Sequence, residues 1–275
     1  MDTTKRIRVI KDLEIRPPSL NLGLEEAISK SVSEGKSPPT IRFWRNERSA
    51  IIGRSQEAEI ELDLKNCKKS DIPVIRRPTG GGAVLHHPGN LNYSLYLPES
   101  SAGSVEEESK KMSGPVASAL SELGPDVRIQ TNGLFVDSLK IGGVAQSRRR
   151  GLLHHGTLLV KRDSFMKEMS SFLRAGRADY DKPVSRVAST PDPVGNIEDL
   201  EGAGVRLPNL VGIIITKFAE TLGGRPDPGK IFEDEWKVAS YLAKSKYSTT
   251  EWNFRYYEDA GGRELEALKR TGGSV

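Results

Sequence analysis

Three consecutive glycines at residues 80–82 constrain the fold of this chain more than any other feature of its sequence. Glycine adopts backbone conformations with positive φ and lets the backbone approach another group closely, which residues with a Cβ resist. Apolar, strand-like segments lie on both sides of the triplet, at residues 73–77 and 83–85, so the glycines form a loop between two strands. Neither a Gly-Lys-Ser/Thr sequence nor a helical pattern follows, which excludes a Walker A phosphate loop.

Charged residues beside this loop suggest that it covers a ligand. Arg76 and Arg77 precede the glycines, and their planar guanidinium groups suit phosphate or carboxylate. His86 and Asn92 follow them, and a simple turn between two strands would not require a histidine and an asparagine at these positions. Further along, Lys140 leads into a second glycine pair and adds a compact positive charge. Together the two segments indicate a site that holds an acid and a nucleotide side by side.

Length and composition limit the class of protein. The 275 residues allow one large domain or two modest ones, and 36% hydrophobic residues suit a globular chain. The sequence lacks an apolar run of about 18 residues, so no membrane-spanning helix is expected. It also begins without the apolar segment of a signal peptide, so a cytoplasmic location is expected. The single cysteine, Cys67, excludes an intramolecular disulfide and a cysteine-rich zinc site.

The net charge of +4 makes an anionic partner plausible but does not predict nucleic-acid binding. Basic and acidic residues number 41 and 37 and are mixed along the whole sequence. The basic run at residues 148–150 is too short for a nucleic-acid-binding stripe with interleaved aromatic residues. We interpret it as a solvated turn, with two alternatives: docking of an acidic protein surface or screening of pyrophosphate.

Apolar spacing predicts helices and strands along the chain. Ser19 is expected to cap a first helix that ends near Gly35, and Ser104 opens a second with a capping box. Further helices are expected at about residues 60–67, 163–174, 210–222 and 231–244. Strands are expected at about residues 41–45, 49–53, 73–77, 83–85, 91–97, 127–129, 134–136, 141–146 and 152–160. Residues 176–208, rich in proline, aspartate and serine, are expected to form a long ordered loop.

The connections between these elements predict the fold class. Strand pairs joined by tight turns favour antiparallel pairing, and we expect strands 83–85 and 91–97 to form one such pair. Helices lie between and after the strands. The expected class is therefore α+β, with a mixed, largely antiparallel β-sheet flanked by α-helices.

The order Arg-Arg-Pro-Thr-Gly-Gly-Gly-Ala-Val-Leu-His at residues 76–86, followed by Gly-Asn-Leu-Asn at 89–92, resembles the lipoate-protein ligase A family of the biotin/lipoate ligase superfamily. Segments 22–27, 43–45, 51–56, 140–146 and 153–159 extend the resemblance, which covers about residues 8–255 and is weakest after residue 160. It implies a catalytic domain of the biotin/lipoate-ligase type at residues 1–258 and a C-terminal tail at 259–275.

The resemblance implies an enzyme that activates lipoate with ATP to lipoyl-AMP. The acyl group would then pass to an acceptor lysine of a lipoyl domain of a 2-oxoacid dehydrogenase, or of the glycine-cleavage H-protein. Magnesium is expected because nucleotide phosphates usually bind it. Lys140 would be the catalytic residue, stabilising charge in both steps. The residues expected to bind lipoate or the adenylate are Arg77, Thr79, Gly80, Gly81, Gly82, Ala83, His86, Asn132, Gly142, Gly143, His155, Gly156 and Thr157.

Three departures from the family pattern leave alternatives open. The family usually reads Asn-Asp where this chain reads Asn132-Gly133, and His87 replaces an expected aspartate. A C-terminal accessory domain, which bacterial lipoate ligases often carry, does not fit into the residues after Asn253. Activation would then need a separate accessory polypeptide. Alternatively, the chain would transfer an octanoyl or lipoyl group between carrier proteins without ATP.

Other considerations bear on these alternatives. Carrier-to-carrier transfer in this superfamily uses a cysteine thiolate, and Cys67 lies in the wrong element for that role. A biotin ligase would have alternating glycine and arginine in its loop, and a non-catalytic lipoyl- or carrier-binding module would not need Lys140. A metal site at His154-His155 is not expected, because adjacent strand residues point to opposite faces. The preference for lipoate or octanoate stays open.

Overall fold

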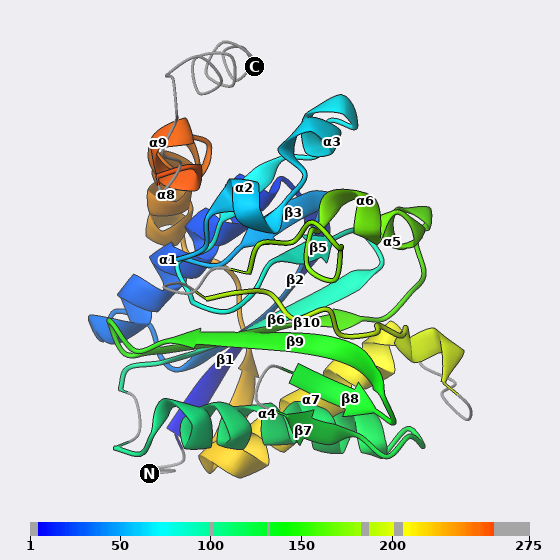
Figure 1. The fold of residues 1–275 in the computed structure, drawn as a ribbon. Helices are drawn as coiled ribbons and strands as arrows, with labels where there is room; N and C mark the ends of the chain where they lie inside the picture. The colour runs from blue at the N-terminus through cyan, green and yellow to red at the C-terminus, as the bar shows by residue number, and fades with distance from the viewer. Residues whose placement is uncertain (1–4, 100–101, 131–132, 183–186, 201–205, 256–275) are drawn as a thin grey trace.

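The computed structural model describes residues 5–99, 102–130, 133–182, 187–200 and 206–255. The expected tail at 259–275 and Asn132 lie outside the described residues. Two sheets form the framework, a large one and a small one (Figure 1). The eight strands of the large sheet follow the order β11-β1-β2-β6-β10-β9-β8-β7, and those of the small sheet follow the order β4-β3-β5.

The large sheet is mixed and mostly antiparallel, as the sequence predicts. Only the pairs of β1 with β11 and of β1 with β2 are parallel within the described sheet. The pairs from β2 through β6, β10, β9 and β8 to β7 are all antiparallel. Its strands are β1 (Lys5–Arg16), β2 (Thr40–Asn46), β6 (Asn90–Leu97), β7 (Arg128–Gln130), β8 (Gly133–Val136), β9 (Leu139–Ser147), β10 (Leu152–Leu159) and β11 (Gly224–Pro228).

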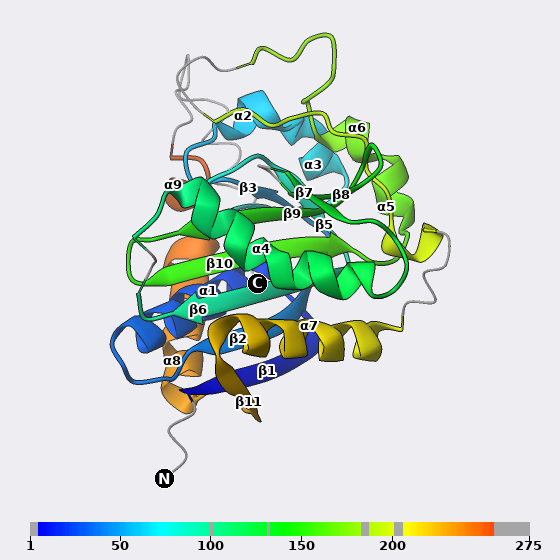
Figure 2. The same cartoon turned by 90° about the horizontal axis from the view of Figure 1, so that it is seen from below.

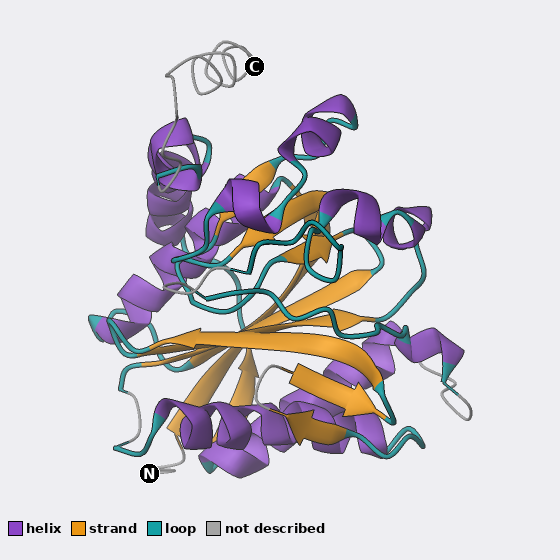
Figure 3. Ribbon diagram, in the orientation of Figure 1, coloured by secondary structure: helices purple, strands orange, loops and turns teal. Residues whose placement is uncertain are grey.

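Helices cover both faces of the large sheet (Figures 1 and 2). On one face, α4 (Val105–Ser121) and α7 (Leu207–Leu222) pack on the side chains of Val9, Phe43 and Tyr93. On the other face, α1 (Pro18–Ser33) and α8 (Glu233–Leu242) pack on Ile10 and Tyr96. Because neighbouring strand residues point to opposite faces, each strand contributes to both cores. The sheet is therefore a buried layer between two helical layers, as the secondary-structure colouring in Figure 3 makes clear.

The small sheet carries the glycine loop. It contains β3 (Ser49–Ile52), β4 (Val74–Arg76) and β5 (Val84–His86), and the loop joins β4 to β5. Short helices pack around it through a core that includes Ile52, Leu85 and Phe172. These helices are α2 (Ala58–Glu61), α3 (Leu64–Lys69), α5 (Ser164–Lys167) and α6 (Met169–Phe172). The remaining elements are the 3₁₀ turn Ile197–Asp199, the π-helical segment Ala243–Tyr247, which extends α8, and α9 (Thr250–Asn253).

The expected pairing of strands 83–85 and 91–97 is wrong. β5 pairs with β3 in the small sheet, whereas β6 pairs with β2 and β10 in the large one. Leu85 packs in the core of the small sheet, while Leu91 packs under α4 and α7. Because these apolar side chains belong to different cores, the short turn between the strands changes sheet instead of making a hairpin.

Several helix boundaries also differ from expectation. The first helix begins at Pro18 rather than after Ser19, because proline is well tolerated where the amide has no helical partner. The expected helices at 60–67 and 163–174 are each two short helices. The capping box at Ser104 is confirmed, and α4 continues through Pro115. β1 and β11 were not expected: β1 interleaves charged and apolar residues, and β11 contains two prolines, which an edge strand tolerates.

Candidate active site

A cavity of about 310 Å³ lies between the glycine loop and strands β9 and β10. The side chains of Leu22, Trp44 and Ile51 form an apolar part of its wall, and residues 187–190 of the long loop contribute another part. Ten of the residues expected from the sequence line it: Arg77, Gly81, Gly82, Ala83, His86, Lys140, Gly143, His155, Gly156 and Thr157. Thr79 and Gly80 belong to the loop but are not among the lining residues, and Asn132 is not described.

Close backbone contact explains two of the glycines around the loop. A Cβ at Gly53 would lie 2.0 Å from the carbonyl oxygen of Gly81, so only glycine fits beneath the loop. Gly81 itself has φ +87°, which L-residues with a Cβ rarely adopt. The Arg54 amide donates to the Thr79 carbonyl at 2.8 Å and fixes the start of the loop against the small sheet. The loop is therefore closely packed on the small sheet in this structure.

The Arg77 guanidinium stabilises the loop from inside. It donates to the carbonyl oxygens of Gly80 at 2.6 Å and Gly82 at 2.8 Å, and to the Thr79 hydroxyl at 3.2 Å. Burial lowers the pKa of Arg77 to about 10, so the group remains a cation at neutral pH. The hydrogen bonds described for this fork go to the protein itself. Contact with a ligand stays a prediction for Arg77.

The expectation of a ligand-facing fork is wrong for Arg76. Its side chain is fully buried and donates to the backbone carbonyls of Gly53, Gln56 and Asn253, at 2.9, 2.6 and 2.8 Å. Asn253 Oδ1 also accepts from the Arg76 amide at 2.9 Å. Arg76 therefore joins α9 to the small sheet.

Lys140 lies at the start of β9, where the long loop runs beside it. Its amide donates to the carbonyl of Pro193 at 2.8 Å, and its own carbonyl accepts from Gly195 at 3.1 Å. Its ammonium group donates to Asp192 Oδ2 at 2.8 Å. The two side chains are 18% and 25% exposed, so this is a partly buried ion pair. Sequence reasoning missed Asp192, because it lies in a loop without a recognisable motif.

A second cavity of about 260 Å³ adjoins the first at Lys140. Gly142, another expected residue, lines this second cavity together with Asp192. Its wall is otherwise mostly apolar and includes Met166, Met169 and Leu173. The ammonium group thus borders two neighbouring spaces, which suits a residue that acts between two ligands.

Gly133 stands at the position where the family resemblance predicts aspartate. A Cβ there would lie 2.1 Å from the carbonyl oxygen of Gly142 and 2.9 Å from Cε of Lys140. A side chain at this position therefore cannot fit without moving the backbone of β9. The carboxylate that lies beside Lys140 is that of Asp192.

His86 is held by hydrogen bonds at both ring nitrogens. Asn46 Nδ2 lies 2.9 Å from Nδ1, and the Thr157 hydroxyl lies 2.8 Å from Nε2. Thr157 in turn donates to Asn92 Oδ1 at 2.7 Å. Burial lowers the pKa of His86 to about 3, with Arg77 adding to the effect, so the imidazole is neutral at neutral pH.

The two adjacent histidines of β10 point to opposite faces, as expected. His155 lines the cavity, whereas His154 lies on the other face of the sheet, with its ring centroid 6.1 Å from that of Tyr93. Burial lowers the pKa of His154 to about 3. Within the described ranges, no group of three or more His, Cys, Asp or Glu side chains could hold a metal ion.

Cys67 lies away from both cavities. It is buried in α3, within the core of the small sheet, and is the only cysteine of the sequence. Burial raises the pKa of its thiol to about 12, so it is not a thiolate at neutral pH. The expectation of a small core residue is confirmed.

The arginine side chains of the basic turn at residues 148–150 lie in two different environments. Arg148 is partly buried and donates to Glu108 Oε2 at 2.7 Å. Arg149 and Arg150 are exposed and line a separate surface recess of about 280 Å³. This cationic recess also contains Lys30, Arg54, Lys246 and one acidic residue, Glu26. Pro78, next to the glycine loop, forms part of its wall.

Comparisons with known proteins agree with this architecture. Residues 17–219 match the family model of the lipoyl protein ligase A/B catalytic domain. One similar structure is a bi-partite lipoate protein ligase from Thermoplasma acidophilum, solved in a study that also covers its E2 lipoyl domain. It has a TM-score of 0.77 and 33% sequence identity, and the match covers 92% of this chain and 98% of that chain. A lipoate-protein ligase A solved with bound ATP has a TM-score of 0.74 and 33% identity, covering 90% and 98%.

A transferase is also among the relatives. The octanoyltransferase LipM of Kyrpidia tusciae is 30% identical over 266 residues, which cover 86% of this chain and 94% of that protein.

None of the helices in the described part of the chain has the length and apolar character that a membrane-spanning helix needs.

Proposed function

Because this chain belongs to the lipoyl protein ligase A/B catalytic domain family, we propose that it is a lipoate-protein ligase that joins lipoate to an acceptor lysine at the expense of ATP. The observation that carries this proposal is the position of Lys140 between two cavities. Both cavities have largely apolar walls, and we assign the first to the acyl chain and the second to part of the nucleotide.

In the first step, the carboxylate of lipoate attacks the α-phosphorus of ATP and displaces pyrophosphate, which gives lipoyl-AMP. Two anionic groups must approach each other, and the Lys140 ammonium offsets their repulsion where it borders both cavities. The glycine loop covers the acyl chain, and Gly81 and Gly82, which line the first cavity, exclude water from the mixed anhydride. Asn132 helps to orient the nucleotide.

In the second step, the ε-amine of the acceptor lysine attacks the acyl carbon and AMP leaves. Lys140 polarises the acyl carbonyl and stabilises the oxyanion that forms. The acceptor is a lipoyl domain, and the glycine-cleavage H-protein is the alternative acceptor. The relative from Thermoplasma acidophilum is bi-partite, so we include a separate accessory polypeptide as a requirement for adenylation.

Magnesium would be held by the nucleotide phosphates and by Asp192, the one carboxylate in the described lining of the second cavity. This set fits the ion, since Mg²⁺ is usually bound by one or two carboxylates together with substrate phosphates. When bound, it would neutralise phosphate charge.

The cationic recess at Arg149 and Arg150 is a docking surface for an acidic partner in this proposal. Its described lining holds five basic residues and one acidic residue, Glu26, whose carboxylate forms an ion pair with Lys246 at 2.5 Å and accepts from Tyr247 at 2.6 Å. Such a surface steers acidic partners and adds salt-dependent affinity.

Transfer of an octanoyl group between carriers is the second candidate, and the LipM relative is the observation that favours it. Cysteine-dependent transfer needs a thiolate in the site, however, and the only cysteine is buried in another core. The ligase function therefore has the stronger support.

ATP–pyrophosphate exchange tests the proposal. The purified chain is given lipoate, octanoate or biotin, with and without the accessory polypeptide, and transfer to a lipoyl domain is followed by mass spectrometry. Exchange that depends on lipoate or octanoate supports a ligase. Transfer from an octanoylated carrier without ATP would favour the transferase instead.

A further inference from the structure

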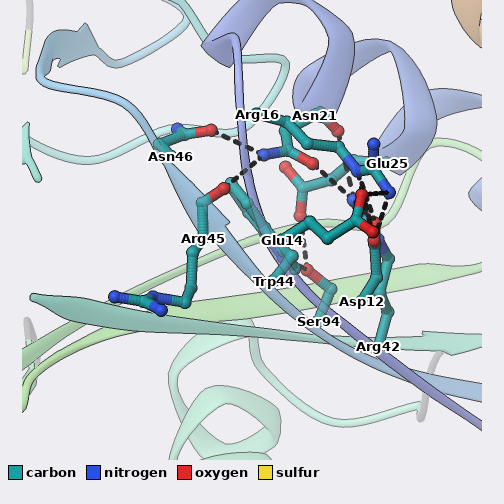
Figure 4. A network of polar contacts seen from close by, with 10 residues as sticks. All are labelled: Asp12, Glu14, Arg16, Asn21, Glu25, Arg42, Trp44, Arg45, Asn46 and Ser94. Carbon is teal, nitrogen blue, oxygen red and sulfur yellow. Dashed lines mark hydrogen bonds and ion pairs between the residues drawn. The ribbon is translucent and has the colours of Figure 1, made fainter. Parts of the chain in front are cut away.

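Glu25 is a fully buried carboxylate on α1 that the reaction above does not use. Its oxygen atoms lie 2.8 and 3.0 Å from Nδ1 of His155, which lines the first cavity. The same carboxylate accepts from the Ser94 hydroxyl at 2.6 Å, and Ser94 accepts from the indole of Trp44 at 2.8 Å. Figure 4 shows Glu25, Ser94 and Trp44 within one network of polar side chains.

The charge of Glu25 determines what His155 can do. Burial acts to raise the pKa of Glu25, but His155, Ser94 and Arg42 outweigh it, and the pKa is lowered. Glu25 is therefore an ionised carboxylate that only accepts hydrogen bonds. The Nδ1 atom of His155 must carry a hydrogen to satisfy it.

The other nitrogen of His155 contacts the glycine loop. Nε2 lies 2.8 Å from the hydroxyl oxygen of Thr79, which is 1% exposed. That oxygen also accepts from Nε of Arg77 at 3.2 Å, and its hydrogen is available to donate to Nε2. With Nδ1–H directed to Glu25, Nε2 is free to accept it. The imidazole thus connects α1 to the glycine loop through a hydrogen bond at each ring nitrogen.

We propose that Glu25 is a positioning residue: it fixes His155 in the Nδ1–H form, and His155 then holds Thr79 so that the glycine loop stays closed over the cavity. The expected effect on lipoate binding rests on the proposed function. The proposal goes further by assigning a role to a buried residue on a helix outside the loop and the cavity wall. Glu25 acts through His155 and touches neither ligand.

Nuclear magnetic resonance of the imidazole nitrogens tests the first part without any ligand. The signal of His155 is assigned by its loss in His155→Gln. We expect Nδ1–H in the wild-type chain and in Thr79→Val, and a reduced share of this form in Glu25→Gln. An unchanged tautomer in Glu25→Gln would overturn the proposal.

Hydrogen exchange at the Arg54 amide reports loop closure, because this amide donates to the Thr79 carbonyl. We expect exchange about tenfold faster in both Glu25→Gln and Thr79→Val, as for the loss of one hydrogen bond. The double variant should be no faster than either single variant, since both break the same connection. If the exchange rates of the two single variants add in the double variant, the proposal is overturned. If Glu25→Gln does not fold, the exchange rate in Thr79→Val alone tests the contact between His155 and the loop.

Calorimetric titration with lipoate measures the consequence for binding. We expect the Kd to rise about tenfold in Glu25→Gln and Thr79→Val, and Thr79→Ser to restore it. Glu235→Gln is the matched control, because Glu235 is also buried and hydrogen-bonded, to Arg8 and Ser37, but lies away from the cavity. A wild-type chain that binds no lipoate or octanoate would contradict the proposed function, while the tautomer and exchange measurements would still decide the role of Glu25.

Discussion

The ammonium group of Lys140 and the carboxylate of Asp192 form an ion pair of 2.8 Å between β9 and the long loop. The Thr190 hydroxyl also donates to the same carboxylate oxygen at 2.8 Å. Lys140 is thus already in contact with an anion before any substrate binds. Substrate anions must replace this carboxylate or share the lysine with it, which couples the loop to ligand binding.

Replacing Lys140 with alanine should abolish both half-reactions. We expect ATP–pyrophosphate exchange and lipoyl transfer to fall at least about 100-fold, the usual cost of losing a group that stabilises developing charge. Circular dichroism should show an intact fold. The control is Lys237→Ala, an exposed lysine on α8. Near-normal turnover by Lys140→Ala would contradict the mechanism.

Replacing Asp192 with asparagine should weaken the response to magnesium. Removing the only carboxylate among the described residues that line the second cavity should raise the half-saturating Mg²⁺ concentration for exchange about tenfold. The control is Asp199→Asn, whose carboxylate pairs with Arg162 at the surface. An unchanged magnesium titration would exclude Asp192 from the ion's environment.

Placing an aspartate at position 133, as the family resemblance predicts, should destabilise this protein. A Cβ at Gly133 would meet the Gly142 carbonyl at 2.1 Å, so β8 and β9 must separate. We expect Gly133→Asp to lower the free energy of unfolding by about 3 kcal/mol or more, measured by urea denaturation. Gly212→Ala, where the added Cβ meets no atom within 4 Å, should be neutral or slightly stabilising. Equal stability of both variants would show that the strands adjust to the side chain.

Reversing the charge of the cationic recess should affect the acceptor and not the activation step. The double variant Arg149→Glu/Arg150→Glu should raise the KM for a lipoyl domain about tenfold, with pyrophosphate exchange unchanged. The wild-type KM should rise with ionic strength, since exposed charges are screened by salt. The matched control is Lys110→Glu/Lys111→Glu, two consecutive exposed lysines on α4. A uniform loss of exchange and transfer would instead indicate damage to the fold.

Stability should fall as the pH drops below about 6.5. Burial lowers the pKa of both His86 and His154 to about 3, so between these values the unfolded chain binds protons that the folded chain does not. Each histidine should then cost about 1.4 kcal/mol of unfolding free energy per pH unit. Urea denaturation at pH 6.5 and pH 5 measures this slope, before most carboxylates titrate. His154→Leu should reduce the slope of stability against pH by the contribution of one histidine. If the slope does not change in this variant, His154 is not one of the groups whose proton uptake causes it.

Much of the fold could be predicted because its signals are local. The alternation in residues 91–97, the capping box at Ser104 and the tight turn after β8 each depend on neighbours in the sequence. These signals predicted a mixed, largely antiparallel sheet with helices, and this prediction is confirmed. The assignment of strands to two sheets could not be predicted, because it depends on which core receives Leu85 and which receives Leu91.

Some residues around the cavity could likewise be predicted from local sequence, and others could not. The glycine triplet and Lys140 could be singled out because unusual residue types stand together, and the structure places both at one cavity. Their roles in the reaction stay predictions. Glu25 and Asp192 carry no such local signal, since acidic residues are common on helices and in loops.

By itself, the sequence determined the fold class, the family and the position of the glycine loop between two strands. Only the tertiary structure decided which partner each buried polar group has. Asp192 reaches Lys140 across 52 residues, and Glu25 reaches His155 across 130. Buried donors and acceptors must find partners without water, so packing of distant segments selects these pairs, and sequence separation carries no information about them.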